Sequence, residues 1–263
     1  MREENDVNKT KIDWADVTWN PVTGCYHSCP YCYAEKVALR FGGHYYGNPE
    51  FTADGLAVLD EPMKRIQKNG RMTAAAFPFY FAPTFHRYKL GEPQREELPR
   101  NIFVCSMADL FGRWVPTSWI VQVMYACLAA PQHNYLFLTK NPERYLELDK
   151  LAILPRKENF WYGTTVTTGE GQLFFVSDDH NTFASIEPMH GPVCQIGQDW
   201  VIVGAETGHR PGKKLPKREW VLDLADECEH LGVPIFMKEN LVKEGVLTPG
   251  EIIRQWPDGL TFA

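Results

Sequence analysis

The stretch DWVIVGAE, residues 199–206, places four apolar residues in a row between an acidic residue at each end. Seven more runs have a similar form: DVTW (16–19), FPFYFAPTF (77–85), NIFVCSMAD (101–109), YLFLTK (135–140), FWYGTTV (160–166), TFASIEP (182–188) and VPIFMKE (233–239). Because polar residues hardly alternate with apolar ones, these runs are typical of parallel strands that are covered on both faces. Helix-like stretches such as PTSWIVQVMYACLAAP (116–131) and KREWVLDLADECEHLG (217–232) lie between them. This order predicts an α/β fold of βαβ units, either a barrel or a doubly wound sheet.

Polar side chains close most of these runs. They are Ser106 and Asp109, Thr139 and Lys140, Thr164 and Thr165, Glu187, Glu206, and Lys238 and Glu239. In a parallel (β/α) barrel the carboxyl ends of the strands form the active-site edge, so these residues favour a barrel, partial or near-complete, of six to eight strands. The same endings also arise where strands simply emerge into water.

Three cysteines stand within eight residues in GCYHSCPYCYAEK (24–36), with the spacing C-x3-C-x2-C: Cys25, Cys29 and Cys32. A structural zinc ion needs four protein ligands, usually as two separated pairs, and no other cysteine has a cysteine partner within four positions. His27 lies between two of the cysteines, where service as a fourth ligand would strain the loop. A [4Fe–4S] cluster held by three thiolates keeps one iron open for an outside ligand, as a catalytic cluster requires.

The C-x3-C-x2-C loop, with Tyr31 just before its last cysteine, resembles the signature of the radical S-adenosylmethionine (radical SAM) superfamily. The chain is most similar to a phage-associated family of uncharacterised radical SAM-like proteins. The similar stretches run from about Trp14 to Trp256: TWNPVTGC, CYAE, SMADLF, PQHNYLFLTKNPERY, SIEPMHGPV, DWVIVGAETG and LGVPIFMKE. FAPTFHRYKL stands where the superfamily often has a Gly-Gly-Glu stretch that binds the amino group of S-adenosylmethionine.

The resemblance implies a radical SAM barrel and two cofactors, a [4Fe–4S] cluster on Cys25, Cys29 and Cys32 and S-adenosylmethionine on the fourth iron. An electron from a donor such as flavodoxin or ferredoxin then cleaves S-adenosylmethionine to a 5′-deoxyadenosyl radical, which abstracts hydrogen from the substrate. The residues expected to bind the cofactor are Tyr31, Ser106, Thr139, Lys140, Thr165, Glu187, Glu206 and Lys238, and Cys105 is the candidate catalytic hydrogen donor. Each of these strand-end residues could equally be a strand-end cap or part of an internal ion pair, and Asp109 could be a helix N-cap.

The 263 residues are expected to form one domain, with 40–76 as a lid and 240–263 as a C-terminal cap. The sequence shows neither a signal peptide nor a membrane span, so a cytoplasmic location is expected. The net charge of −6 excludes a uniformly basic nucleic-acid-binding protein. It leaves room for one local basic stretch, which is either a DNA contact or a solvated loop: Arg210, Lys213, Lys214, Lys217 and Arg218.

For the substrate, the resemblance favours a modified pyrimidine in phage DNA, for example an amino-acid adduct on thymine of the glycyl-thymine type that an isomerase, mutase or lyase would rearrange. Such a base would be flipped into the pocket. DNA repair like that of spore photoproduct lyase, radical chemistry on a free nucleotide or small metabolite, and a non-catalytic iron–sulfur or zinc interaction module remain alternatives.

Overall fold

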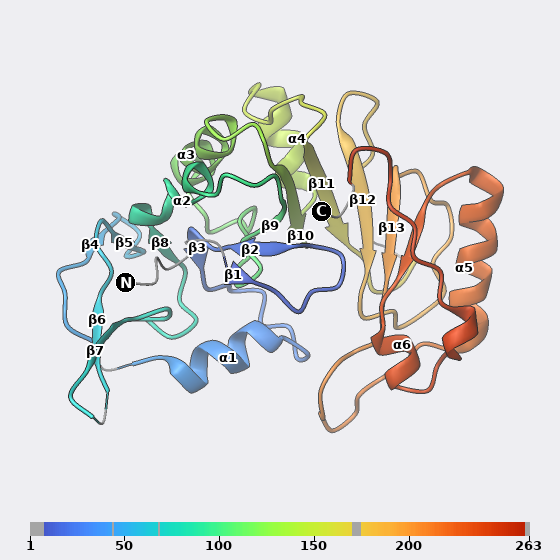
Figure 1. Cartoon of the computed structure of the whole chain (residues 1–263), viewed down its shortest axis with the longest axis horizontal. Coiled ribbons are helices and arrows are strands. Elements are labelled where there is room, and N and C mark those ends of the chain that lie inside the picture. The colour runs from blue at the N-terminus through green and yellow to red at the C-terminus, as the bar shows by residue number, and fades with distance from the viewer. Residues whose placement is uncertain (1–7, 44, 68, 170–174, 261–263) are drawn as a thin grey trace.

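The computed structural model describes residues 8–43, 45–67, 69–169 and 175–260. Its main sheet has the strand order β1-β2-β9-β10-β11-β12-β13-β14 and curls into an open half-barrel (Figure 1). Seven strands run parallel: β2 (Val17–Trp19), β9 (Asn101–Val104), β10 (Asn134–Thr139), β11 (Phe160–Thr165), β12 (Asn181–Ile186), β13 (Trp200–Val203) and β14 (Ile235–Met237). The short β1 (Asn8–Lys9) pairs antiparallel with β2. The predicted partial parallel barrel is therefore confirmed.

Alternate residues of the strands face opposite sides, as the two-residue period of a strand requires. The outer face packs on three helices, α3 (Thr117–Leu128), α4 (Glu143–Lys150) and α5 (Arg218–Leu231). Tyr135 and Phe137 share a buried cluster with residues of α3 and α4, and Val201 and Val203 share one with residues of α5.

The inner face of the half-barrel is filled with large side chains, which form one buried cluster: Trp14, Phe103, Leu136, Trp161, Phe183, Trp200, Ile202, Phe236 and Leu260. Gly163 makes this packing possible, because a Cβ at that position would lie 2.2 Å from the ring of Phe183. The body of the half-barrel is thus a packed core, and access to the inner side is left to the carboxyl edge of the strands.

Residues 77–85 were expected to form a strand of this sheet, and that expectation is wrong. Residues 78–81 form a turn, and β8 (Thr84–His86) belongs to a second sheet of order β3-β8-β5-β4. The other strands of that sheet are β3 (Val22–Thr23), β4 (Glu50–Phe51) and β5 (Ala57–Leu59). Pro78 and Pro83 explain the difference, since proline cannot donate the hydrogen bond that a central strand needs. Phe85 of β8 stacks on Trp119 of α3, with ring centroids 5.1 Å apart, and so joins this sheet to the half-barrel.

The two segments expected to be a lid and a cap are built as follows. After α1 (Tyr33–Phe41), the segment 40–76 contains β4, β5 and a hairpin of β6 (Lys64–Ile66) and β7 (Met72–Ala74). The short helices η1 (Arg87–Lys89) and α2 (Glu92–Arg95) follow β8. From residue 240 the chain forms α6 (Asn240–Lys243) and η2 (Pro249–Glu251), and Trp256 and Leu260 then pack on the inner face. Residues 44, 68 and 261–263 of the two segments lie outside the described residues. No helix in the described part of the chain is long and apolar enough to cross a membrane.

Candidate functional site

The cysteine loop begins at a glycine that no other residue could replace without strain. Gly24 has φ +88°, and a Cβ there would lie 2.3 Å from the carbonyl oxygen of Ala82. Its N–H donates to the carbonyl of Met107 (2.9 Å), and the N–H of Cys25 donates to that of Phe81 (3.0 Å). The loop is therefore fixed between the turn before β8 and the segment that follows β9, at the carboxyl edge of the sheet.

The second half of the loop is a turn that opens directly into α1. The N–H of Cys32 donates to the carbonyl of Cys29 (3.0 Å), and the sulfur of Cys32 caps the helix by accepting from the N–H of Glu35 (3.4 Å). A helix N-terminus favours negative charge, so this position suits a thiolate. Cys25, Cys29 and Cys32 are all half-buried and none forms a disulfide.

The three thiols are close enough to influence one another. Burial raises the pKa of Cys25 to about 12, and negative charge on Asp109, Cys29 and Cys32 adds to that rise. Burial also raises the pKa of Cys29, while the Lys140 ammonium and a hydrogen bond from Tyr31 act in the opposite direction. The raised pKa values favour the protonated thiols of Cys25 and Cys29, and a metal centre that bound these thiols would displace their protons.

The donor set fits a cluster better than a single ion. Among the residues that the structure describes, no three His, Cys, Asp or Glu side chains are grouped so that they could hold one metal ion. In an iron–sulfur cluster each thiolate binds a different iron, so three neighbouring sulfurs need not meet at one point. Three free thiols on one short, fixed loop therefore match a three-cysteine cluster.

Asp109 ties this loop to the sheet, a role that the sequence did not reveal. Its Oδ2 accepts from Nε2 of His27 (2.7 Å) and from the N–H of Lys140 (2.9 Å). Its Oδ1 accepts from Oγ1 of Thr139 (2.7 Å) and from the N–H of Phe111 (3.0 Å). No helix begins at Asp109, so its interpretation as an N-cap is wrong. Thr139 belongs to the buried outer side of β10 and completes this network.

Lys140 lies at the end of β10, on the side that faces the cysteine loop. Its Nζ is 5.4 Å from the centre of the Tyr31 ring, and no described side chain or carbonyl pairs with it. Burial lowers the pKa of Lys140, whereas negative charge on Cys29 and Asp109 raises it. Its ammonium is thus placed to balance charge on the cysteine sulfurs.

A half-buried ion pair lies at the carboxyl ends of β12 and β14. Nζ of Lys238 donates to both carboxylate oxygens of Glu187 (2.7 and 2.8 Å), and Nδ2 of Asn240 donates to one of them (3.2 Å). Gly204 makes room for the pair, since a Cβ there would lie 3.0 Å from Lys238 and 3.1 Å from Glu187. The pair presents one positive and one negative group at the edge.

A second acidic group, Glu206, is buried and forms an ion pair with Arg210. The guanidinium donates to both carboxylate oxygens of Glu206 (2.7 and 2.9 Å) and holds its pKa below the usual range. His190 lies 3.6 Å from the same carboxylate, and the edge of its ring meets Tyr31, with centroids 5.7 Å apart. His190 was not foreseen, because no ligand-like spacing marks it in the sequence.

Three other expected site residues, Ser106, Thr165 and Cys105, have no described side-chain contact with the groups above. The hydroxyl of Ser106 donates to Oδ1 of Asn20 (3.2 Å), and its carbonyl accepts from the Tyr33 hydroxyl (2.8 Å). Thr165 is half-buried at the end of β11. Cys105 is only 2 % exposed and is part of the outer hydrophobic cluster, and this burial raises its pKa to about 12. Its role as a hydrogen donor stays a prediction.

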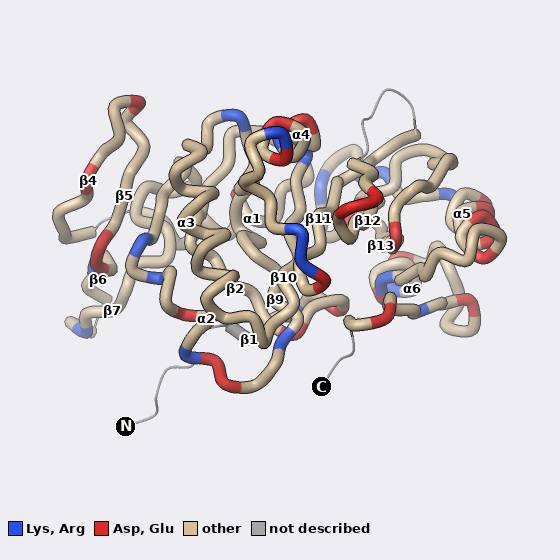
Figure 2. Tube along the Cα trace, turned by 90° about the horizontal axis from the view of Figure 1, so that it is seen from above, with Lys and Arg blue, Asp and Glu red and all other residues tan. Residues whose placement is uncertain are grey.

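The basic stretch at 210–218 is largely neutralised by acidic partners. Arg210 pairs with Glu206, Lys213 with Glu244 (2.6 Å), Lys217 with Glu219 (3.4 Å) and Arg218 with Glu251. The stretch leads into α5, which carries five acidic residues and one arginine, and Figure 2 shows this helix as a strongly acidic end of the molecule. Lys214 forms no ion pair with a described residue. A DNA contact through this stretch stays a prediction that the charges do not favour.

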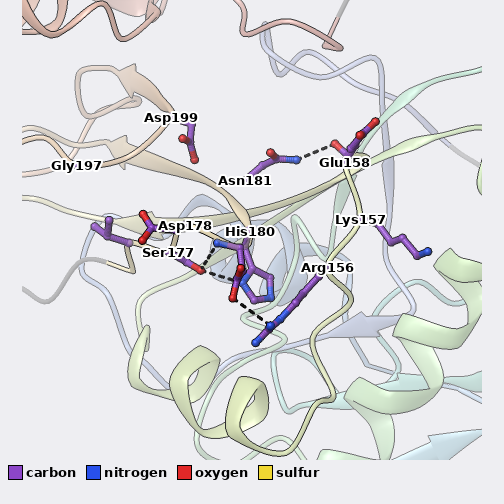
Figure 3. Close-up of a pocket in the computed structure, with 11 residues that line it drawn as sticks. Arg156, Lys157, Glu158, Ser177, Asp178, His180, Asn181, Gly197 and Asp199 are labelled. Carbon is purple, nitrogen blue, oxygen red and sulfur yellow. Dashed lines mark hydrogen bonds and ion pairs between the residues drawn. The ribbon is translucent and has the colours of Figure 1, made fainter.

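A pocket of about 430 Å³ lies elsewhere, at the amino-terminal ends of the strands (Figure 3). Arg156, Ser177, Asp179, His180 and Asp199 are among the residues that line it. His180 bonds to Ser177 within one turn (3.0 Å), and Arg156 pairs with Asp179 (3.0 Å). Because these residues precede β11, β12 and β13, the pocket is at the opposite edge of the sheet from the cysteine loop.

Comparisons with known proteins give a family match over most of the chain, partial matches to curated proteins, and a superposition on a solved structure. Residues 9–244 match the family described as "Protein of unknown function (DUF5131)". Lys-gingipain of Porphyromonas gingivalis is 25 % identical over 161 residues, and Lys-gingipain W83 of the same species is 24 % identical over 161 residues. Each of these matches covers 60 % of this chain and 9 % of the relative, so the chain spans only a small part of their length. A solved structure of a spore photoproduct lyase mutant, with bound AdoMet and a dinucleoside spore photoproduct, superposes with a TM-score of 0.46 and 12 % identity. That superposition covers 90 % of this chain and 59 % of the lyase chain.

Proposed function

The chain belongs to the DUF5131 family of proteins of unknown function, and we propose that it is a radical SAM enzyme. The observation that carries the proposal is the cysteine loop itself, with three unbridged, half-buried thiols fixed at the carboxyl edge of a parallel half-barrel. In α/β barrels that edge is where catalytic residues gather.

Cys25, Cys29 and Cys32 would hold three irons of a [4Fe–4S] cluster. When bound, the cluster and S-adenosylmethionine supply a 5′-deoxyadenosyl radical that abstracts hydrogen from the substrate. The protein orients the reactants and keeps water away from them. Asp109 and His27 fix the loop, and the Lys140 ammonium offsets negative charge on the sulfurs.

The remaining groups at the edge suit the polar parts of S-adenosylmethionine. Its methionine part carries a carboxylate and an ammonium, and the Glu187–Lys238 pair offers a complementary partner to each. Tyr31, Ser106, Thr165 and Glu206 can accept or donate hydrogen bonds to the carboxylate or the ribose. Thr139 is engaged with Asp109 and would act by holding Lys140 in place.

For the substrate we propose a modified pyrimidine in DNA, rearranged or cleaved as part of a phage-type DNA modification. A carbon–hydrogen abstraction suits the rearrangement of an amino-acid adduct on thymine. The packed inner face supports access only from the carboxyl edge, and a base would therefore have to be flipped out of its stack to reach the cluster. The alternative substrates at the same edge are a free nucleotide, a small metabolite and a DNA photoproduct that the enzyme would repair.

The test begins with anaerobic reconstitution. We expect close to four irons per chain and release of 5′-deoxyadenosine on addition of dithionite and S-adenosylmethionine. Replacement of Cys25, Cys29 or Cys32 with alanine should abolish both, because each thiol would hold one iron. Cys127→Ala and Cys228→Ala are the matched controls, since both thiols are fully buried in the core and should leave the iron content unchanged. One zinc per chain and no uptake of iron would falsify the proposal.

The substrate test uses mass spectrometry of nucleosides. We expect DNA that carries an amino-acid adduct on thymine to be converted, with faster release of 5′-deoxyadenosine than in its absence. Conversion of the free nucleotide and not of the DNA would instead indicate a small-molecule enzyme.

A further inference from the structure

A projecting part of the molecule lies beside the cysteine loop. It consists of α1, residues 33–41, and the β6–β7 hairpin, residues 64–67 and 69–74; we call it the α1–hairpin arm. Tyr46, which follows α1 in the chain, exchanges both backbone hydrogen bonds with Lys64 of the hairpin (3.0 Å each). Figure 1 shows α1 on the other side of the strands from α3 and α4.

The arm is basic in an acidic chain. Five exposed cations lie on it, against a single acidic residue, Glu35: Lys36, Arg40, Lys64, Arg65 and Arg71. Within the described part of the chain, none of the five forms an ion pair. Arg65 reaches only the carbonyl of Phe41 (3.5 Å), and Arg40 lies over the ring of the same residue (5.3 Å). These charges are free to meet an anionic partner, unlike the paired cations of 210–218.

Exposed apolar and aromatic side chains are interleaved with these cations. Along α1, Tyr33, Val37 and Phe41 follow one another at the spacing of one helix face, and half of the Tyr33 and Phe41 side chains is exposed. Tyr46, next to the hairpin, is 66 % exposed, and Ile66 and Met72 of the hairpin are about half exposed. Several exposed apolar side chains on neighbouring elements are a feature of surfaces that bind a partner.

We propose that the α1–hairpin arm binds a single-stranded segment of nucleic acid, with its cations on the phosphates and its exposed rings stacked on the bases. Lysine and arginine both bind phosphates, whereas lysine is depleted from interfaces with other proteins. Rings among cations are typical of single-strand binding, in which each base stacks on an aromatic side chain. Since Cys32 caps the N-terminus of α1, a strand on the arm passes beside the cysteine loop. The inference rests on the proposed function only for the claim that the bound strand is also the substrate.

The test measures binding of a fluorescein-labelled oligothymidine to the reconstituted protein by anisotropy, over a series of salt concentrations. The arm variant is Lys64→Ala, Arg65→Ala, Arg71→Ala. We expect it to bind at least about 10-fold more weakly and to lower the log–log salt slope by about 2, because each lost contact with a single strand contributes about 0.7. The matched control is Lys213→Ala, Lys217→Ala, Arg218→Ala, which removes the same charge from ion-paired positions and should bind as the wild type does.

A second pair of variants separates stacking from charge. Tyr46→Ala should weaken binding by about 10-fold and leave the salt slope unchanged, because a stacked ring contributes no counterion release. Tyr125→Ala is the control, since that ring is 67 % exposed on α3, away from the arm.

Wild-type affinity in the arm variant, or loss of binding in the 210–218 control, would overturn the inference. Slower reduction of the cluster by flavodoxin in the arm variant, with strand binding unchanged, would also overturn it and assign the arm to an electron-donor protein. Iron content and 5′-deoxyadenosine release are measured on the same samples. Strand binding through the arm without deoxyadenosine release refutes only the radical chemistry, and release with unaltered binding in the arm variant refutes only the arm.

Discussion

Asp109 accepts hydrogen bonds from three separate parts of the chain, namely the cysteine loop, the end of β10 and its own turn. A buried carboxylate with several charge-assisted hydrogen bonds is strongly held, and its loss leaves those donors without a partner. His27, by contrast, is a partly exposed residue whose main described partners are Asp109 and the Trp114 ring (4.9 Å). Asp109 therefore stabilises the fold as well as the cysteine loop, whereas His27 stabilises only the loop.

Replacement of these two residues should separate the two effects. His27→Ala should reduce the retention of iron with little change in the free energy of unfolding. Asp109→Ala should reduce iron retention and also lower the free energy of unfolding by about 2 kcal/mol or more, since buried donors lose their acceptor. Urea titrations and iron assays on both variants measure this, and full iron retention in both would show that the network does not hold the loop.

His86 gives a prediction for pH. Its ring is fully buried at the end of β8, where Nε2 bonds to Oγ1 of Thr23 on the neighbouring strand β3 (2.8 Å), and this burial lowers its pKa to about 3. The unfolded chain takes up a proton near pH 6.5, whereas the folded chain does not until about pH 3. Stability from this group is therefore complete above pH 6.5 and is lost as the pH falls toward 3.

We expect the free energy of unfolding to fall by about 1.4 kcal/mol per pH unit from His86 alone between pH 6 and 4. Burial also lowers the pKa of His133, His180 and His190, so these residues add to the same trend. His86→Gln should make the pH dependence shallower without abolishing it. Urea unfolding at several pH values measures this, and an identical pH dependence in the variant would rule out a neutral buried His86.

At the scale of elements, the cysteine loop depends on a close approach between two backbone segments. Gly24 has left-handed φ and its missing side chain is replaced by the carbonyl of Ala82. Gly232, which ends α5, has a similar φ of +70° but open space where a Cβ would lie. Both glycines therefore need a positive φ, but only Gly24 lies against another backbone segment.

Gly24→Ala should therefore displace the loop and lower iron binding severalfold, with a loss of stability above the cost of φ alone. Gly232→Ala should cost about 1 kcal/mol of stability, as for other left-handed helix ends, and leave iron binding intact. Thermal unfolding and iron content distinguish these outcomes. Equal effects of the two changes on iron content would mean that the contact with Ala82 is not what positions the loop.

At the scale of the whole molecule, acidic and basic residues are concentrated at opposite ends. The inner face of the half-barrel is filled, and the reactive groups lie on the carboxyl edge. The acidic α5 lies at one end of the molecule and the β6–β7 hairpin at the other (Figure 2). A polyanion would thus be repelled at one end and attracted at the other, which gives it one orientation on the edge.

The sequence was enough to predict a parallel barrel, partial or near-complete, and to single out the three cysteines as candidate ligands of a metal centre. Both are local patterns, since an apolar run predicts a buried strand and three thiols within eight residues predict one metal centre. It was also enough to predict which polar residues close the strands, because the end of a parallel strand fixes its edge. The prediction of a central strand at 77–85 was wrong for a local reason as well, because the two prolines in this run cannot donate backbone hydrogen bonds.

Only the tertiary structure decided what those polar residues contact. Asp109 and His27 are 82 residues apart, and Glu206, Glu244 and Glu251 neutralise a basic stretch that looked free in the sequence. The five cations of the α1–hairpin arm are unremarkable one by one in the sequence, because their lack of partners appears only when the rest of the described chain is folded around them. Hydrogen bonds and ion pairs depend on distances of a few ångströms between segments that are distant in sequence, and residue spacing does not encode those distances.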